Sequence, residues 1–411
     1  MTRLPGLSQW QQTVSTHLPH LSRPQVVMLS LWSLGMVLAQ RCGLTQVAVF
    51  LAYLLGCREQ AVRERLRDGY RDAEAKSGAK RGDQRRSLDV PTCFAPLLRW
   101  VVALHPPDCR HLALAMDAST LGQRFTVLSI HVLIRGCAIP VAWHIVRATA
   151  KGAWQPQWEA LFHQLHGSVP DDWTVIVAAD RGLYAKWLFQ AITARGWHPF
   201  LRINRQGTYC PDGADTFRPL SQVVTLPGGR WKGSVRCFTT PKRQLACTLV
   251  ARWDAGYKDP WLVLTDLPPT VADVAWYSLR AWIECSYKDM KRGGWHWEQT
   301  KMTNPRRAER LWLAMALATL WVVSVGCHAE ATQPAIILTA LPETHIARRR
   351  ATGRRPPRSL SCFHRGRLLL MAAFIHGHEL PPMQLLPEPW PKSLDTHGAR
   401  PPTDQPHQKA A

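Results

Sequence analysis

Apolar residues recur along the chain with two different spacings, which predict a helical start followed by a mixed α/β region. From about Pro24 to Asp68 the apolar positions follow helical spacing. Three later runs rich in Val, Ile and Leu predict consecutive strands joined by short turns: LALAMDAS, FTVLSIHVLI and IPVAWHIVRA. Helical and strand-like segments then alternate as far as HPFLRIN. This order predicts a mixed α/β sheet.

The pattern changes between residues 206 and 269. Gly-Gly and Pro there interrupt short alternating runs such as SVRCFTT, LACTLVARW and PWLVLTDL. Such runs predict a mostly β insertion. A helix is predicted next over about 271–291, followed by an apolar helix over about 306–326.

Two apolar segments, 26–56 and 311–326, raise the question of a membrane span. Gln40, Arg41 and Gln46 interrupt the first segment, and the second has only sixteen residues. A spanning helix needs about twenty uninterrupted apolar residues. We therefore predict two buried helices and no membrane contact.

Composition divides the chain into three predicted regions. Residues 1–105 form an all-helical region with a polar, charged linker at about 72–89. Residues 106–330 hold the α/β domain, including its β-rich insertion at about 206–269. Residues 331–411 contain a strongly basic stretch and one more helix. They end in a Pro-rich tail, from about Pro381, that is predicted to be disordered.

The charge balance indicates a polyanionic partner. The 411 residues include 51 Lys and Arg against 29 Asp and Glu, which leaves a net charge of +22. Because the basic residues are spread along the whole chain, nucleic acid is the first candidate and a membrane surface the second. The nineteen Trp residues fit either core packing, which we favour, or stacking on unpaired bases.

The eleven Cys residues indicate a reducing compartment. They include no Cys-x-x-Cys pair and their number is odd, which argues against a zinc knuckle and against a disulfide framework. The first twenty residues lack the basic start, apolar run and cleavage site of a signal peptide. We therefore predict a cytoplasmic protein that starts near Met1.

Residues 44–68 have the layout of a helix-turn-helix. An apolar helix (LTQVAVFLAYL) is followed by Gly56 and then by a basic segment, CREQAVRERLRDG. A basic second helix of this kind enters the major groove of DNA in many regulators. The arginines that would face DNA are Arg58, Arg63, Arg65 and Arg67. An ordinary helical hairpin with solvated arginines remains the alternative.

Two aspartates follow apolar runs. Asp117 comes after LALAM and Asp180 after VIVAA, so both are predicted to lie at strand ends. Unpaired burial of such a carboxylate costs several kcal/mol, so it is usually exposed or bound to a cation. If the two strands are neighbours, the carboxylates would form a Mg²⁺ site for phosphoryl transfer. A turn or helix-cap role is the alternative for each aspartate alone.

The predicted helix over 271–291 carries a polar stripe. Its members follow one another at intervals of 3, 4, 4 and 3 residues, which places them on one helix face. They are Tyr277, Arg280, Glu284, Lys288 and Lys291. One carboxylate among cations suits a metal ligand whose neighbours hold phosphate oxygens. A set of helix-surface salt bridges is the alternative.

Tyr277, Arg280, Glu284 and Lys291 match the Tyr-Arg-Glu-Lys signature in residue type and spacing. In this respect the chain resembles the DDE transposases of bacterial insertion sequences, in the family numbered four. The segment Asp180-Arg181-Gly182-Leu183-Tyr184 resembles that family's second-aspartate motif. The resemblance covers about residues 110–330.

The resemblance implies a ribonuclease H-like fold and a DNA transposase. Asp117, Asp180 and Glu284 would hold two Mg²⁺ or Mn²⁺ ions, with Tyr277, Arg280 and Lys291 on the DNA phosphates. Relatives cut through a DNA hairpin and stack a flipped base on a Trp, for which Trp253 and Trp261 are the candidates. The partner would be double-stranded DNA, namely the terminal inverted repeats and the target, bound by a homodimer in the bacterial nucleoid.

The expected chemistry is in-line attack on phosphorus, first by water and then by the freed 3′ hydroxyl. Two ions about 3.5 to 4 Å apart would stabilise the attacking and leaving oxygens. One alternative is another ribonuclease H-like nuclease without joining activity. The other is a non-catalytic, domesticated DNA-binding regulator.

Overall fold

The structure is a computed structural model that describes residues 5–76, 86–152, 154–332 and 360–392. The described residues form two compact units. Unit 1 is drawn from Met1–Ile176 and Leu279–Pro389, and unit 2 from Val177–Ser278 and Trp390–Ala411. Unit 1 therefore groups the N-terminal helices with the first three strands.

The N-terminal part of unit 1 is helical, as predicted. Its elements are α1 (Pro5–His17), α2 (Arg23–Ala39), α3 (Leu44–Leu55), α4 (Glu59–Tyr70), the short 3₁₀ turns η1 (Ala73–Ala75) and η2 (Pro91–Cys93), and α5 (Phe94–Ala103). Gly56 ends α3 with a φ of 61°, a left-handed conformation that glycine adopts without steric cost. This turn leads into α4, so the predicted helix-turn-helix layout is present. Arg58 precedes α4 instead of lying within it.

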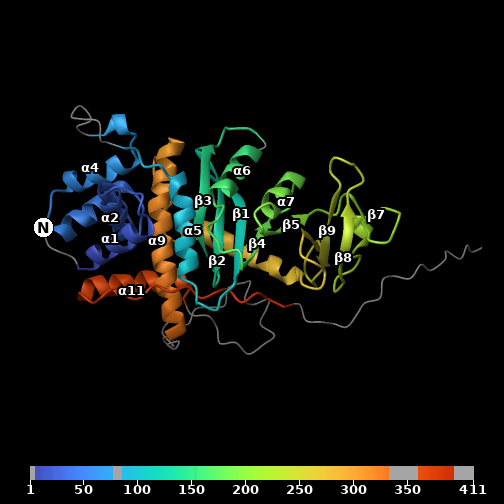
Figure 1. Cartoon of the computed structure of the whole chain (residues 1–411). Helices are drawn as coiled ribbons and strands as arrows, with labels where there is room; N and C mark the ends of the chain where they lie inside the picture. Colours follow the sequence, from blue (N-terminus) through green and yellow to red (C-terminus); the bar gives the residue numbers. More distant parts are fainter. Residues whose placement is uncertain (1–4, 77–85, 153, 333–359, 393–411) are drawn as a thin grey trace, which may run out of the picture. The chain divides into compact units, whose positions relative to one another are not determined.

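A single long helix, α9 (Pro305–Thr332), lies at the centre of unit 1. It packs against α2, α11 (Cys362–His376) and β3 (Cys137–Arg147), between the N-terminal helices and the strands (Figure 1). Among the described residues, α9 is the one helix long and apolar enough to cross a membrane, and α2 with α3 forms a pair that passes the same test but is bent by 93°. Of the most apolar window of α9, 94% is buried. The segment 311–326 is therefore part of a buried helix, as predicted, whereas the segment 26–56 forms the mostly buried α2 and the half-exposed α3.

Glycines allow the backbones of α9 and α11 to touch. A methyl group at Gly326 would overlap the carbonyl oxygen of Cys362, and one at Gly366 would overlap the carbonyl oxygen of Val322. Side chains at either position would push the helices apart. Ser361 caps the start of α11, where its Oγ accepts a hydrogen bond from the His364 N–H at 3.3 Å.

The three predicted strands of unit 1 form an antiparallel sheet, β1 (His111–Leu121), β2 (Phe125–Ile134) and β3. Every residue of β2 is buried, so both faces of the sheet are covered. The helix α6 (Gln155–Gln164) packs against β3. Further along the chain are η4 (Val274–Ala281), α8 (Trp282–Met290) and η5 (Trp297–Gln299), and α8 contacts β1, β2 and β3.

The position of Asp117 corrects the sequence prediction. Asp117 does not end a strand but lies within β1, opposite Ser129 of β2. The apolar run stops at Met116, yet the strand continues to Leu121 because its more polar half still pairs with β2 as far as the turn at Gly122. An apolar run indicates which residues are buried, but it does not indicate where the strand ends. A strand that continues into a solvent-exposed region is longer than its apolar run.

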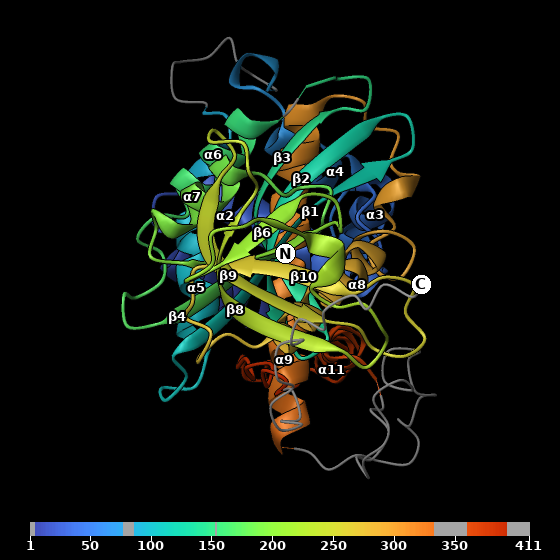
Figure 2. The same cartoon turned by 90° about the vertical axis from the view of Figure 1, so that its right-hand side faces the viewer.

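Unit 2 contains the predicted β-rich insertion. Its helix α7 (Lys186–Thr193) packs against β5 (His198–Ile203). The first strand, β4 (Thr174–Ala179), begins in unit 1. The unit is completed by the turn η3 (Leu220–Gln222) and five further strands: β6 (Thr208–Pro211), β7 (Arg218–Pro219), β8 (Arg230–Cys237), β9 (Leu245–Arg252) and β10 (Trp261–Thr265). The strand order is β4-β5-β10-β9-β8-β6-β7. Because β10 pairs with both β5 and β9, the insertion and β5 belong to one sheet. Its strands β8, β9 and β10 are labelled in Figure 2.

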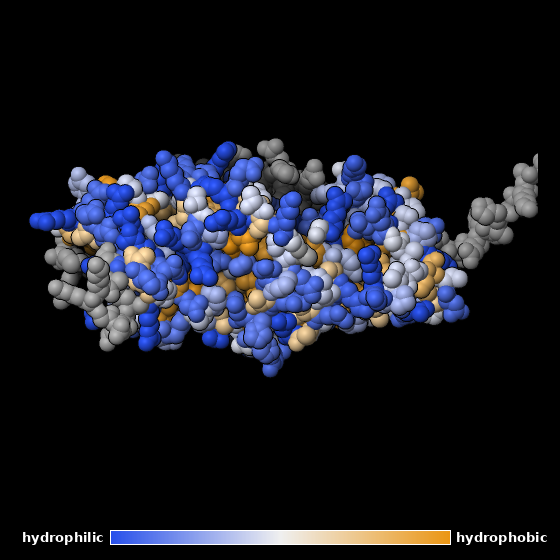
Figure 3. Space-filling model, turned by 90° about the horizontal axis from the view of Figure 1, so that it is seen from above, coloured by the Kyte–Doolittle hydropathy of each residue, from blue (hydrophilic) through white to orange (hydrophobic). Residues whose placement is uncertain are grey.

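The Trp residues mainly serve packing, as favoured. Eleven of the nineteen are buried: Trp10, Trp32, Trp100, Trp143, Trp158, Trp173, Trp197, Trp295, Trp297, Trp312 and Trp321. Hydrophilic residues cover most of the face seen from above, with apolar residues in patches between them (Figure 3). The largest exposed apolar side chains include Tyr53 and Phe50 on α3.

The start of the Pro-rich tail is ordered, contrary to the prediction. The Leu385 N–H donates to the Leu104 carbonyl at 2.8 Å, and its side chain is fully buried. The Gly136 N–H donates to the Glu388 carboxylate at 3.0 Å. Prolines prevent regular structure here, but single hydrogen bonds and one apolar anchor still fix the segment. Most of the basic stretch and residues 393–411 lie outside the described part of the chain.

Candidate active site

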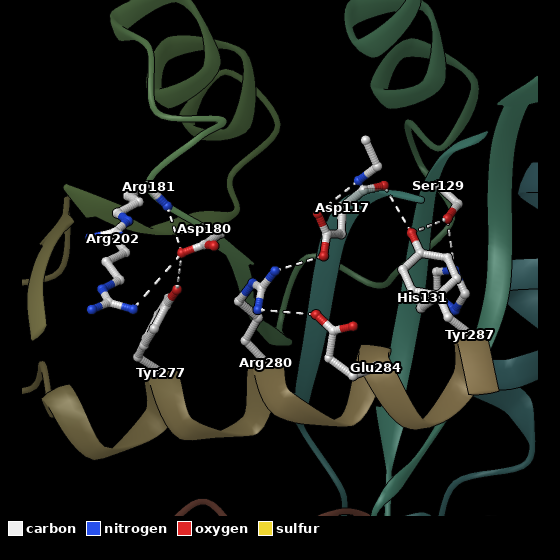
Figure 4. Close-up of polar contacts among 11 residues, drawn as sticks. Asp117, Ser129, His131, Asp180, Arg181, Arg202, Tyr277, Arg280, Glu284 and Tyr287 are labelled. Carbon is white, nitrogen blue, oxygen red and sulfur yellow. Dashed lines mark hydrogen bonds and ion pairs between the residues drawn. The ribbon is translucent and has the colours of Figure 1, made fainter. Parts of the chain in front are cut away.

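Asp117 is held by partners on both oxygens in unit 1. Its Oδ1 accepts a hydrogen bond from the Ala118 N–H at 2.8 Å. Its Oδ2 accepts one from the Arg280 guanidinium at 2.6 Å, across 163 positions of the chain (Figure 4). Charge-assisted contacts of this length are strong and favour the ionised carboxylate. Asp117 is therefore oriented as an anion at the centre of β1.

Arg280 also approaches Glu284. A second nitrogen of its guanidinium lies 3.6 Å from the Glu284 carboxylate, one helical turn further along. The Glu284 side chain is 61% exposed, whereas that of Asp117 is 19% exposed. One guanidinium thus pairs with a carboxylate of a strand and a carboxylate of a helix. Helix-surface salt bridges, the alternative considered from the sequence, account only for the pair within the helix.

The two lysines of the predicted stripe point to different places. The Lys291 ammonium donates to Ser119 Oγ at 2.8 Å and to the Thr120 carbonyl at 2.9 Å. Burial lowers the pKa of Lys291. Lys288 is exposed, and its charge helps to lower the pKa of His364 in α11, although burial is the larger cause. Arg280 and Lys291 therefore contact β1 and Glu284 contacts Arg280, whereas Lys288 lies towards α11.

In unit 2, Asp180 directly follows β4, as predicted. Its Oδ1 accepts a hydrogen bond from the Arg181 N–H at 2.8 Å. The Tyr277 hydroxyl donates to the same oxygen at 3.4 Å, and Arg202 lies 4.0 Å from it (Figure 4). Tyr277 belongs to the 3₁₀ segment η4, so the predicted α-helix over 271–291 begins as a tighter helix. Sequence reasoning did not identify Arg202.

The two Trp candidates differ in their surroundings. Trp261 at the start of β10 meets the ring of Tyr277 edge-on, with the ring centres 5.3 Å apart. Trp253 lies in the loop after β9, where its Nε1 donates to the Tyr257 carbonyl at 2.9 Å and the Arg205 guanidinium lies over its ring. Trp261 is thus in contact with a residue that binds Asp180.

Comparison with protein families identifies this region. The model of the transposase DDE domain matches residues 111–321, which is just over half of the chain and includes Asp117, Asp180 and Glu284. The chain belongs to the transposase DDE-domain family. No curated protein sequence matches it. A solved structure, the cryo-EM structure of the piggyBac transposase synaptic complex with hairpin DNA, is similar at a TM-score of 0.34 and 12% identity, covering 84% of this chain and 85% of that one.

The donor types in this transposase suit a hard divalent cation. Carboxylate oxygens are the ligands that Mg²⁺ and Mn²⁺ prefer, and the DDE domain offers two in unit 1 and one in unit 2. Asp117 and Glu284 are close enough to share one guanidinium. Within the described ranges, no three His, Cys, Asp or Glu side chains form an assembled metal-binding group.

Sequence reasoning missed four buried polar residues behind Asp117. They are Ser129 and His131 of β2 and Ser286 and Tyr287 of α8. A useful signal was present, since Ser129 and His131 are the polar members of one face of an otherwise apolar strand. Buried polar groups need partners, so two on one strand face indicate a hydrogen-bonded network.

Asp289, two residues after Tyr287 in α8, offers a test of stability. Burial raises the pKa of Asp289 to about 7, despite the opposing charges of Lys288 and Arg367. A carboxyl group whose pKa is raised on folding favours the folded state when protonated, so stability falls as the pH rises from about 4 to 7. We expect Asp289→Asn to raise the free energy of unfolding by up to about 4 kcal/mol at pH 8, and by less than half of that at pH 5.

Urea unfolding of both proteins at the two pH values measures this difference. Asp172→Asn is the matched control, because the Asp172 side chain is 64% exposed. An Asp289→Asn protein less stable than wild type at both pH values would contradict the expectation.

Proposed function

We propose that this DDE-family chain is a metal-dependent DNA transposase of a bacterial insertion sequence in the family numbered four. The observation that carries the proposal is the guanidinium of Arg280, which contacts Asp117 and Glu284 together. A family match over both motifs and a net charge of +22 add support. The activity would be cleavage at the element's ends and joining to target DNA.

Asp117, Asp180 and Glu284 would hold the divalent ions, two Mg²⁺ or Mn²⁺. When bound, such ions stabilise the charge on the attacking and leaving oxygens of a phosphodiester. Arg280 contacts Asp117 and Glu284, and Tyr277 contacts Asp180, so both residues would orient carboxylates and offer hydrogen-bond donors to phosphate. Lys291, fixed on β1, would place a cation beside the same strand.

Other parts of the chain would bind the DNA. The proposed contacts to the terminal inverted repeats come from α4 and the residue before it, namely Arg58, Arg63, Arg65 and Arg67. Lys288 would add a phosphate contact from α8. Cleavage would pass through a hairpin with a flipped base, for which Trp261 is the stronger of the two candidates because it touches Tyr277. The active complex would be a homodimer.

A cleavage and joining assay tests this function. The purified full chain is incubated with Mg²⁺ and a duplex that carries the short inverted repeats flanking its own coding region. We expect cuts at the repeat ends and products joined to a second duplex, both abolished by EDTA. Cutting without joining would replace the proposal by the ribonuclease H-like nuclease. Binding without cutting would replace it by the DNA-binding regulator.

A further inference from the structure

A chain of hydrogen bonds runs through the core behind Asp117. The Tyr287 hydroxyl donates to the Asp117 backbone carbonyl at 3.0 Å and lies 2.9 Å from Ser129 Oγ. Ser129 Oγ lies 2.9 Å from His131 Nε2 (Figure 4). His131 Nδ1 lies 3.0 Å from Ser286 Oγ. All four side chains are at most 5% exposed. These hydrogen bonds therefore connect β1, β2 and α8 where bulk water does not reach.

The carbonyl at one end fixes the direction of every proton. A carbonyl oxygen only accepts, so the Tyr287 hydroxyl must donate to it and its oxygen must accept from Ser129. Ser129 has then used its one proton, so its oxygen accepts from His131 Nε2–H. His131 Nδ1 is left without a proton and accepts from the Ser286 hydroxyl. Tyr287, Ser129 and His131 thus each donate once and accept once, and Ser286 donates at the far end.

This order requires a neutral imidazole with its proton on Nε2. Burial lowers the pKa of His131 to about 3, so the ring is neutral across the physiological range. Burial is also the main cause that raises the pKa of Tyr287, and the carboxylate of Asp117 adds to it. The rings of His131 and Tyr287 also meet edge-on, with their centres 5.3 Å apart. Because His131 and Tyr287 are both neutral, the hydrogen-bonded side chains need no counter-charge in the core.

We propose that Ser129, His131, Ser286 and Tyr287 form a positioning relay that sets the spacing between Asp117 and Glu284. The inference rests on the proposed function. Tyr287 lies three residues after Glu284 in α8, so the bond from its hydroxyl to the Asp117 carbonyl joins the backbones that carry the two carboxylates. Ser129 is the cross-strand partner of Asp117, which gives the relay a second hold on the same point of β1.

The relay has a specific advantage over apolar packing. Apolar side chains could fill this space, but they would hold α8 at no particular height against β1. Hydrogen bonds have narrow optimal lengths and angles, so a connected set defines one arrangement. Metal-assisted phosphoryl transfer loses rate steeply when ligands shift, because the geometry of the reacting atoms is part of the catalysis. The relay residues therefore act through Asp117 and Glu284 and do not touch the DNA.

Tyr287→Phe tests the relay because it removes one hydroxyl and keeps the ring. We expect the single-turnover cleavage rate at saturating DNA to fall at least tenfold, with the Kd for end DNA within twofold of wild type. Ser129→Ala should lower the rate similarly, and the double variant should lose less than a further twofold because both break one chain. Tyr209→Phe, at a buried tyrosine in unit 2, is the control and should cleave at the wild-type rate.

A cleavage rate within twofold of wild type in Tyr287→Phe would overturn the proposal. So would equal losses of rate and DNA affinity, which indicate general misfolding.

The proton order is tested without any activity by ¹⁵N NMR of histidine-labelled wild-type protein. We expect His131 to be the neutral Nε2–H tautomer throughout pH 5 to 8, with its signals assigned by their absence in His131→Gln. An Nδ1–H tautomer or a titrating ring would overturn the relay. A wild-type chain that cuts no DNA would instead overturn the proposed function, so the two failures are distinguishable.

Discussion

Replacing Asp117 by asparagine is expected to lower the rate of DNA strand cleavage by at least about a thousandfold. Asparagine keeps the shape of the side chain and its acceptor for the Ala118 N–H, but it removes the charge that would attract a divalent cation. Asp180→Asn and Glu284→Gln should have losses of the same size. Cleavage is measured under single-turnover conditions, alongside the Kd for end DNA, which we expect to stay within about threefold.

The control for this series is Asp172→Asn, which removes a carboxylate of unit 1 whose side chain is 64% exposed. It should cleave at the wild-type rate. Normal cleavage by any one of the three site variants would remove that residue from the catalytic set. Thermal unfolding of each variant identifies a loss of rate that comes from a loss of fold.

Gly366→Ala is expected to lower the free energy of unfolding by about 3 kcal/mol or more. The added methyl group would overlap the carbonyl oxygen of Val322 and would lie 2.8 Å from the Gly326 nitrogen. These are backbone atoms of α9, so no side chain can rotate away, and the two helices must separate. The separation would also open the packing of Phe363 against Trp295.

Urea unfolding measures this loss, and Gly182→Ala provides a matched control in unit 2. A methyl group at Gly182 would have no heavy atom within 4 Å beyond its chain neighbours. Its stability should therefore change by no more than about 1 kcal/mol. Equal stabilities of Gly366→Ala and wild type would contradict the close approach of α9 and α11.

The sequence was most informative where burial and periodicity coincide. The strands β1, β2 and β3 and the helix α9 were predicted because their apolar positions face a core. The same signal failed for Asp117, since β1 continues as a strand after its apolar run ends. It failed again at Leu385, because one buried side chain and a few backbone hydrogen bonds leave no periodic trace.

The candidate site followed a similar rule. Arg280, Glu284 and Lys291 were predicted together because helical spacing relates them, and in the structure Arg280 and Lys291 contact β1 while Glu284 contacts Arg280. Lys288 shares that spacing but lies towards α11, where its charge helps to lower the pKa of His364. Helical spacing does not reveal which other elements pack beside a residue. The relay partners of Tyr287 come from another strand, and single-sequence periodicity cannot connect residues of separate elements.

The central position of α9 also means that its two sides are covered at different times during synthesis. One of its apolar sides meets α2, which is translated before α9, and another meets α11, which is translated after it. The side that receives α11 therefore stays uncovered while the intervening residues are translated. During that interval the nascent chain would expose an apolar surface to which chaperones can bind. Expression yield would depend on how quickly α11 is translated and packs against α9.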